Sequence, residues 1–450
     1  MPPRYHRLLF SILTFCLFET AVWAQTDELY DALPSPEYIN SISGLSSGDL
    51  VKLTLERNPQ ILAIRQRLTE TQGLLKQAAL SPNPDLSFSI TDGSILNSPG
   101  EREYSVSYVH TFELGGKRTR RVDVAAFEVQ SARYEIANQQ RELVADVKTA
   151  YAEALAAIRN LEVLRQTLDL IQKINEITIQ RVREGESPTL EEGLSTVELN
   201  RVKAEFPLIS SQVQSKISEL KLVSGINADQ ALLLKTEFSF EDSRIDSRDL
   251  LMKALESRPD LQAARLQEKK AESEIALAKA EAISNVNGLA SYTRSLTQFD
   301  QFGLDDTRQL VPLKDRDNTI SAGISINLPF RNRNQGNIQA AISRKETARL
   351  RTQALEKSIG QEVASAVITY KAALEALRIF SNNILPQSSK NLEVVRASYE
   401  LGELRFLDLI QEQRRAFEIQ NAYTDVLKTY YLSIIQLEKA TGVPLAGQEE

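Results

Sequence analysis

The spacing of hydrophobic side chains follows two periods along the chain, and each period predicts a different kind of element. Over most of the chain apolar residues recur every three or four positions, which is typical of amphipathic helices. The longest such stretch, 117–184, contains neither glycine nor proline, and as one helix it would reach ~100 Å. Its apolar positions alternate in steps of four and three, as in a coiled-coil seam. These positions are Leu143, Val147, Ala150, Ala154, Ala157, Leu161, Leu164, Leu168 and Ile171.

Further helices are predicted on both sides of this stretch. The same spacing covers the ranges 48–80, 189–224, 248–283, 337–400 and 403–441. Pro207 and Pro386 fall inside two of these ranges. Because proline removes a backbone donor and clashes with the preceding turn, we expect each to bend or break its helix.

Four shorter segments alternate apolar and polar residues with a period of two, which predicts strands. The strands cover 86–91, 104–112, 288–296 and 320–328. The segment from Ile320 to Leu328 is the clearest, whereas Arg294 interrupts the apolar face of its neighbour. The polar faces carry Ser, Thr and Asn, and about nine residues is the length of a tilted membrane-spanning strand.

Four strands are too few to form a closed membrane barrel, which needs about eight, and an open sheet edge is not tolerated in lipid. A membrane role would therefore require several chains: two would supply eight strands and three would supply twelve. The alternative from periodicity alone is an ordinary four-stranded sheet in a soluble domain. In both cases the fold class is mainly α with a small β part.

An internal repeat explains the order of these elements. The segment 55–61 (LERNPQI) matches 255–261 (LESRPDL) at an offset of 200. The segment 185–191 (GESPTLE) matches 402–408 (GELRFLD) at an offset of 217, as Ser224-Gly225-Ile226 matches Thr441-Gly442-Val443. The growth of the offset places a net insertion of 17 residues in the second copy, and 297–318 is its expected place.

The repeat divides the chain into six segments. Residues 1–24 have the basic start, apolar run and small-residue end of an export signal, so we expect the mature chain to begin at Gln25. Phe15 precedes Cys16 inside the apolar run, which disfavours lipidation of that cysteine. The other segments are a polar stretch at 25–47, the first copy at 48–235, a connection at 236–247, the second copy at 248–443 and a tail at 444–450.

Composition then narrows the function. A net charge of -7 disfavours nucleic-acid binding, which needs a basic face. Loss of 1–24 would leave no cysteine and one histidine, His110, which excludes thiol catalysis and zinc sites rich in Cys or His. His110 lies on the apolar side of its strand, where a packed histidine is expected rather than a metal ligand. With no motif for nucleophilic catalysis, we expect neither enzymatic activity nor a cofactor.

At this point the chain resembles the TolC-like outer membrane efflux family, also called outer membrane factors. The resemblance covers nearly the whole mature chain and rests on the duplicated order of helix, two strands, helix, turn and helix. It rests also on Ser81-Pro82-Asn83-Pro84 before the first strand, on the paired glycine turns and on Thr441-Gly442-Val443. The run 112–118 (FELGGKR) resembles the heavy-metal efflux branch, that of CzcC and CusC.

The resemblance implies a homotrimer in the outer membrane of a Gram-negative bacterium. Three chains would form a twelve-stranded β-barrel and a long α-helical barrel of coiled coils in the periplasm. A periplasmic adaptor (membrane fusion) protein and an inner-membrane pump of the RND type would dock to it. The chain would be the passive exit duct of this tripartite efflux system, exporting heavy-metal cations. Drug efflux and type I protein secretion stay open, and a soluble periplasmic coiled-coil scaffold or a periplasmic hydrolase are alternatives of another class.

Two groups of candidate residues follow from the resemblance. The adaptor-docking turns at the periplasmic tips are expected at Gly185-Glu186 and Gly402-Glu403, where a left-handed backbone suits glycine. The gate that closes the periplasmic entrance is expected at Tyr399, Arg405, Asp408 and Glu191. Gln411 stands where the family often has a second acid, and Arg405 lies one position later than the usual basic residue. The alternatives are plain turns and acids that stabilise helix N-termini.

The run Gly115-Gly116-Lys117-Arg118 is the third candidate group. It lacks the spacing of a phosphate-binding loop and the buried strand before it. We expect a junction between strand and helix at the membrane boundary, with Lys117, Arg118 and the following arginines near lipid headgroups or at the neck of the tunnel.

Overall fold

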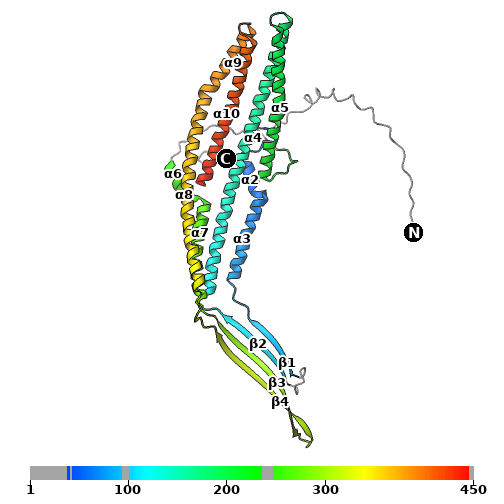
Figure 1. Ribbon diagram of the computed structural model, residues 1–450, viewed down its shortest axis with the longest axis vertical. Helices are drawn as coiled ribbons and strands as arrows, with labels where there is room; N and C mark the ends of the chain where they lie inside the picture. The colour runs from blue at the N-terminus through cyan, green and yellow to red at the C-terminus, as the bar shows by residue number, and fades with distance from the viewer. Residues whose placement is uncertain (1–37, 41–42, 94–100, 236–246, 445–450) are drawn as a thin grey trace, which may run out of the picture.

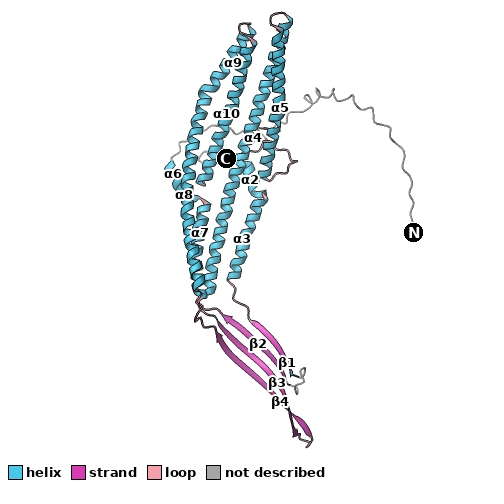
Figure 2. Ribbon diagram, viewed as in Figure 1, coloured by secondary structure: helices cyan, strands magenta, loops and turns pink. Residues whose placement is uncertain are grey.

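The computed structural model describes residues 38–40, 43–93, 101–235 and 247–444. The expected export signal at 1–24 lies outside this part of the chain. The molecule is elongated: a bundle of long helices continues at one end into a four-stranded sheet, which is inclined to the helix axes (Figure 1). Helices and strands occupy separate parts of the molecule (Figure 2), so the mainly α fold with a small β part is confirmed.

The first copy contains α2 (Ser47–Arg57), α3 (Pro59–Ala78), α4 (Lys117–Arg183) and α5 (Thr189–Ser224). Helix α4 is uninterrupted, as its composition predicts, and every residue of the predicted seam is buried or half-buried. Pro207 does not break its helix, because α5 continues through this residue. The prediction of a break is therefore wrong.

The second copy contains α6 (Ser247–Ser257), α7 (Pro259–Glu281), α8 (Gln335–Ile379), α9 (Leu385–Glu400) and α10 (Phe406–Thr441). A short π-helical segment, η2 (Phe380–Ile384), joins α8 to α9. It ends two residues before Pro386, whose missing N–H and bulky ring cannot continue the ordinary helical bonding pattern. The single helix expected over 337–400 is therefore divided at this point, and the helix expected at 403–441 begins only at Phe406.

The single helices predicted at 48–80 and 248–283 are wrong, because each is two helices. The break falls at Asn58 in the first copy and at Arg258 in the second, and both residues have an extended ψ, 123° and 121°. The cause is the following proline, Pro59 or Pro259, which disfavours helical backbone at the residue before it. Of the polar segment expected at 25–47, Ile39 and Leu45 form bridges with Leu234, and α2 begins at Ser47.

The sheet has the order β1 (Asp85–Asp92), β2 (Arg102–Phe112), β3 (Val286–Leu304) and β4 (Leu310–Ile326), with antiparallel neighbours. The predictions of 288–296 and 320–328 are too short. Both strands continue into the segment expected to hold the insertion, which forms a long hairpin with a register shift between Gln298 and Phe302. Charged residues hid the strand signal there, because a hairpin exposed on both faces needs no alternation.

The pairing register gives the sheet one apolar and one polar face. Phe88, Val106, Tyr292 and Ile320 lie in one row across the four strands. The row beside it is Ser89, Ser105, Thr293 and Thr319, and the hydroxyl oxygens of Ser89 and Ser105 are 2.7 Å apart. The apolar face is open in the single chain: Ile320 is 83% exposed. Such a face requires an apolar medium or a partner surface.

Two hydrophobic cores reproduce the duplication along the helices. Each joins the short helices of its copy to the bases of the long ones. Equivalent buried pairs are Leu50 and Leu250, Ile61 and Leu261, and Leu220 and Leu437. Within the described residues, no helix is both long enough and apolar enough to cross a membrane.

Candidate functional site

The two turns at the far ends of the long helices have the same geometry. Gly185 and Gly402 both have positive φ, 81° and 78°. The N–H of Glu186 donates to the carbonyl of Arg181 at 2.9 Å, and the N–H of Glu403 donates to that of Ser398 at 2.8 Å. These bonds close a Schellman turn, in which the left-handed residue is normally glycine. A Cβ at Gly185 would meet no other atom, so the backbone angle alone demands glycine here.

The helices that return from these turns begin with acidic residues. Glu191 lies half-buried in the first turn of α5. In α10, the carboxylate of Asp408 accepts the N–H of Arg405 at 3.3 Å, and both side chains are exposed. Carboxylates at these positions satisfy free N–H groups and interact favourably with the helix dipole. A capping role therefore accounts for Asp408 within one chain.

Tyr399 is the predicted gate residue with the most contacts. It lies near the end of α9, is 2% exposed, and its hydroxyl is 2.9 Å from that of Thr178 on α4. The guanidinium carbon of Arg181 lies 5.0 Å from the centre of its ring, and Arg181 also donates to the carbonyl of Tyr399 at 2.9 Å. Phe406 packs edge-on against the ring. The tyrosine thus joins the tip of the second copy to that of the first.

Arg181 and Thr178 were not predicted as site residues, although they hold Tyr399. Arg181 also approaches Glu186, with Nε 3.8 Å from the nearer carboxylate oxygen. Arg405 was the expected basic partner, but among the described residues no hydrogen bond or cation-π contact joins it to Tyr399; Arg181 makes these contacts instead. An arginine in the last turn of a helix is common, and nothing in the sequence distinguishes this one from its neighbour Arg183.

A buried carboxylate forms a second link between the copies nearby. The side chain of Glu198 on α5 is 4% exposed and accepts bonds from Arg201, at 2.7 Å, and from Arg414 on α10. Burial alone would raise the pKa of Glu198, but the bonds from Arg414 and Arg201 outweigh it and lower the pKa to about 2. Glu198 is therefore ionised at every physiological pH, and its charge holds α10 close to α5.

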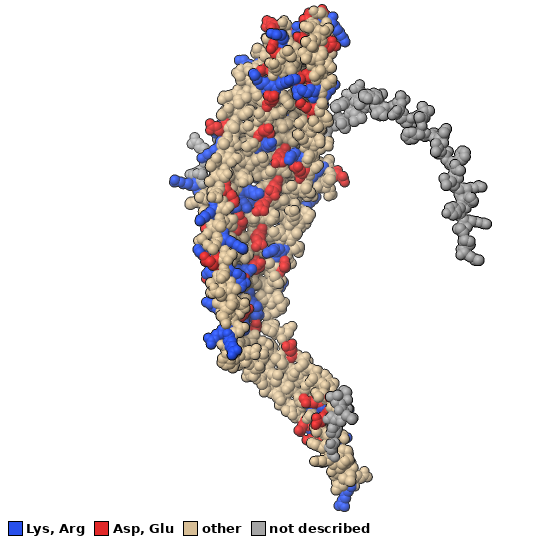
Figure 3. Space-filling view, viewed as in Figure 1, with Lys and Arg blue, Asp and Glu red and all other residues tan. Residues whose placement is uncertain are grey.

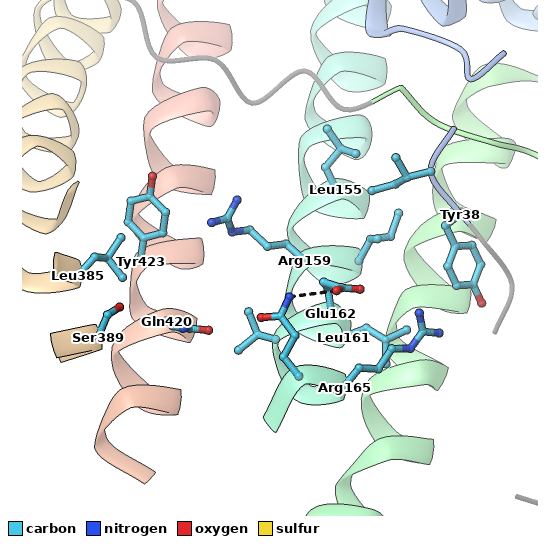
Figure 4. Close-up of a pocket in the computed structure, with 14 residues that line it drawn as sticks. Tyr38, Leu155, Arg159, Leu161, Glu162, Arg165, Leu385, Ser389, Gln420 and Tyr423 are labelled. Atoms are coloured by element: carbon cyan, nitrogen blue, oxygen red, sulfur yellow. Dashed lines mark hydrogen bonds between the residues drawn. The ribbon is translucent and has the colours of Figure 1, made fainter. Parts of the chain in front are cut away.

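A cavity of about 720 Å³ separates α4 from α9 and α10 at mid-height (Figure 4). Across it, Arg159 and Tyr423 point toward one another, with the guanidinium carbon 5.2 Å from the ring centre. Nearer the sheet, Ala145 and Ala152 pack directly on Ile435. The two long hairpins, α4–α5 and α9–α10, therefore touch below the cavity and again at their tips.

Comparison with known proteins decides the identity of this arrangement. Residues 50–225 and 250–443, almost all of both copies, match the family of outer membrane efflux proteins. The chain belongs to this family. It is an outer membrane efflux channel that extends into the periplasm.

Among relatives of the efflux protein is the cobalt-zinc-cadmium resistance protein CzcC of Cupriavidus metallidurans. It is 22% identical over 395 residues, which are 87% of this chain and 88% of the relative. Outer membrane protein TolC of Vibrio cholerae is also 22% identical, over 86% of this chain and 88% of its own. The crystal structure of CusC has the same fold, with a TM-score of 0.70, 15% identity and coverage of 88% and 92% of the two chains.

The third predicted group occupies the junction between β2 and α4 of the efflux protein. Gly115 and Gly116 both have positive φ, and a Cβ on Gly115 would lie 2.7 Å from a methyl carbon of Ile283. Lys117 is buried and donates to the side chain of Asn285 at 2.5 Å, whereas Arg118 is exposed. The glycines thus permit a close crossing of the chain before the helix begins.

His110 lies on the apolar face of β2, beside Phe112, with ring centres 4.7 Å apart. Its buried Nδ1 has no hydrogen-bond partner among the described residues. In the same part of the chain no group of three or more His, Cys, Asp or Glu side chains is arranged to hold a metal ion.

Proposed function

We propose that the efflux protein is the passive exit duct of a tripartite system that exports heavy-metal cations. The match to the cobalt-zinc-cadmium resistance protein over most of both chains carries this proposal. A second relative, the nickel-cobalt-cadmium resistance protein NccC, is 28% identical over 127 residues. The chain would perform no chemistry and bind no cofactor, and an inner-membrane pump of the RND type would supply the energy.

The working unit would be a homotrimer. Among the described residues, one edge of β1 and one edge of β4 have no neighbouring strand, and lipid does not tolerate such edges. Three sheets joined edge to edge would make twelve strands, with the apolar rows toward lipid and the Ser and Thr rows toward water. The long hairpins would then surround a continuous periplasmic tunnel.

The tips would dock a periplasmic adaptor. Apolar side chains stand exposed beside both glycine turns: Leu190 is 69% exposed, and Leu401 is 76% exposed. Exposed leucines beside a rigid turn are suited to burial by a partner. Glu186 and Glu403 lie in the turns themselves and would add charge to the same surface.

The gate would lie between the two hairpins of each chain. Tyr399 and Arg181 hold the tips together, and the cavity below them leaves room for the α9–α10 hairpin to move. Opening would break these contacts but leave the packing of Ala152 on Ile435 intact. Arg405, Asp408 and Glu191 lie around the entrance, where their charges would act on passing cations.

Metal tolerance of a deletion strain tests the proposal. We expect loss of the gene to sensitise cells to cobalt, zinc and cadmium, and the wild-type chain to restore growth. The double variant Gly185→Ala/Gly402→Ala should fail to restore it, because each alanine strains the left-handed turn by about 1 kcal/mol and misplaces the docking surface. Gly193→Ala is the matched control, since Gly193 has open space and an ordinary φ. Sensitivity to organic drugs alone would favour drug efflux instead.

A further inference from the structure

Basic side chains gather at one level of the molecule, where the strands of both copies pass into long helices. We call this group the basic belt: Lys117, Arg118, Arg120, Arg121, Arg331 and Arg333. Figure 3 shows Lys and Arg side chains at this end of the helical part, whereas the adjoining part of the sheet carries few charges.

Contacts around α7 bring the two halves of the belt together. Lys117 at the start of α4 bonds to Asn285, just after α7. Before α8, Asn334 donates to the carbonyl of Ala278 in the last turns of α7 at 2.8 Å. The basic residues of both copies are therefore anchored to the same end of one helix.

Two arginines of the belt are paired with acids of the chain, and three are not. Arg121 forms a two-pronged pair with Glu113, and Arg120 lies 3.4 Å from Asp123. Arg118, Arg331 and Arg333 are exposed, and no acid of the described residues lies within 4.0 Å of them. Aligning the left-handed residues that precede α4 and α8, Gly116 and Asn334, places Arg331 at the position of Glu113, so an arginine replaces the acid that balances the first copy.

Large apolar side chains adjoin these free arginines on the side of the sheet. Phe330, which directly precedes Arg331, is 78% exposed, and Leu328, three residues before Arg331, is 65% exposed. In the first copy Phe112 and Leu114 are 53% and 44% exposed beside Lys117. Phe112 belongs to the apolar face of the sheet, as its pairing with Val286 shows. An exposed apolar band edged by cationic groups has the order of a membrane interface, acyl chains first and headgroups next.

We propose that the basic belt binds anionic phospholipid headgroups of the leaflet that faces the periplasm. Arg118, Arg331 and Arg333 would donate to lipid phosphates, while Phe330 and Leu328 enter the acyl region. Arginine suits this role because its guanidinium bonds phosphate through two parallel N–H groups. The proposal rests on the proposed function, since it needs the sheet to lie in the membrane. Beyond that function, it names anionic phospholipids as the lipids that fix how deeply the channel is inserted in the membrane.

Lipid binding to the full-length trimer in detergent tests the proposal. The probes are phosphatidylglycerol and phosphatidylcholine, with thermal stability and retained lipid as readouts. We expect phosphatidylglycerol to be preferred. In the triple variant Arg118→Gln/Arg331→Gln/Arg333→Gln its affinity should fall roughly a hundredfold, because each basic residue near an anionic surface contributes roughly fivefold. The matched control is Arg351→Gln/Lys357→Gln/Lys371→Gln, three exposed basic residues along α8, which should keep the preference.

Several outcomes would overturn the proposal. The first is that wild type and the triple variant prefer phosphatidylglycerol over phosphatidylcholine to the same extent. The second is that the triple variant keeps this preference but its channel current has an altered ion selectivity, which would place the arginines in the conduit. If the triple variant does not fold, salt titration of the wild type decides, because headgroup binding must weaken as salt rises. Failure of the proposed function would appear separately, as unchanged metal tolerance of the deletion strain or as no current in bilayers, with the lipid preference intact.

Discussion

Asn58 in the first copy and Arg258 in the second occupy equivalent positions, and they close the same helix break with different chemistry. Asn58 caps α3 by accepting the N–H of Gln60 at 2.8 Å, and its amide donates to the carbonyl of Val223 near the end of α5 at 3.0 Å. Arg258 donates to the equivalent carbonyl of Ala440 at 3.1 Å. The backbone task is thus the same in both copies.

The arginine brings a buried charge that the asparagine does not. Its side chain is 4% exposed, and it pairs with Asp260 at 2.6 Å and with Glu362 at 2.5 Å. Burial would raise the pKa of Asp260, but the bonds from Arg258 outweigh it and lower this pKa. Arg141 of α4 approaches the same carboxylate at 3.7 Å, so this network also ties the first copy to the second.

The links at the tips follow the same rule. Thr178 and Arg181 of the first copy hold Tyr399, but at an offset of 217 the positions equivalent to the first two are Val395 and Ser398. The contact therefore exists in one direction only. The two copies therefore share the arrangement of helices that the duplication gave them. The contacts that join one copy to the other use positions at which the two copies have different residues.

The largest expected effect comes from removing the buried arginine. Arg258→Met should lower the free energy of unfolding by about 3 kcal/mol, because Asp260 and Glu362 lose their partner and Asp260 stays largely buried. Denaturation of the detergent-solubilised protein measures it. Restoring neutrality with Arg258→Met/Asp260→Asn should recover part of the loss. If Arg258→Met lowers the free energy of unfolding by no more than Asn58→Ala does, Arg258 and Asn58 contribute equally to stability and the comparison fails.

A pH effect of intermediate size is expected at Glu198. Its pKa is about 2 when folded, below the ordinary value of 4.5, so its bonds stabilise the fold above about pH 4.5. This stabilisation should be lost as the pH falls from 4.5 toward 2, by about 2 kcal/mol, since half-exposed Arg414 is partly screened. Arg414→Gln should flatten the dependence, while Arg415→Gln, at the position equivalent to Glu198, should not. Parallel acid-denaturation curves for wild type and Arg414→Gln would refute the link.

The smallest expected effect is at the neutral cap. Asn58→Ala should cost about 1 kcal/mol, because it removes one capping bond and one bond to the end of α5. Asn58→Asp separates the two bonds: it keeps the cap but cannot donate to Val223. If Asn58→Ala lowers the free energy of unfolding as much as Arg258→Met does, the neutral and the charged residue at the helix break do not differ in their contribution to stability.

Much of the fold could be predicted from the sequence because its signals are long and local. The range 117–184 has no helix breaker, and the strands alternate wherever one face is apolar. The breaks at Asn58 and Arg258 were missed although the prolines after them are visible, because helical spacing continues across them. The extended hairpin was missed because its exposed residues, such as Lys314 and Asp315, carry no alternation.

The candidate site could be predicted only in part. The tip turns need a residue with positive φ, and glycine stands at this position in both copies of the repeat. Gly185 and Gly402 could therefore be predicted. The partners Thr178 and Arg181 depend on how two hairpins far apart in the sequence meet in space. Neither periodicity nor local spacing indicates where the two hairpins come into contact. The sequence therefore cannot distinguish a polar helix residue in that interface from one exposed to solvent.

Single-channel conductance of the full chain in planar bilayers tests the central claim most directly, that the chain is a conduit closed by contacts between its copies. Wild type should conduct weakly, and Tyr399→Ala and Arg181→Ala should each raise the conductance severalfold, because either change frees the second tip. Arg183→Ala, an exposed arginine two residues from Arg181, should leave it unchanged. Equal conductance in all four proteins would contradict the gate, and the absence of any channel would contradict the account as a whole.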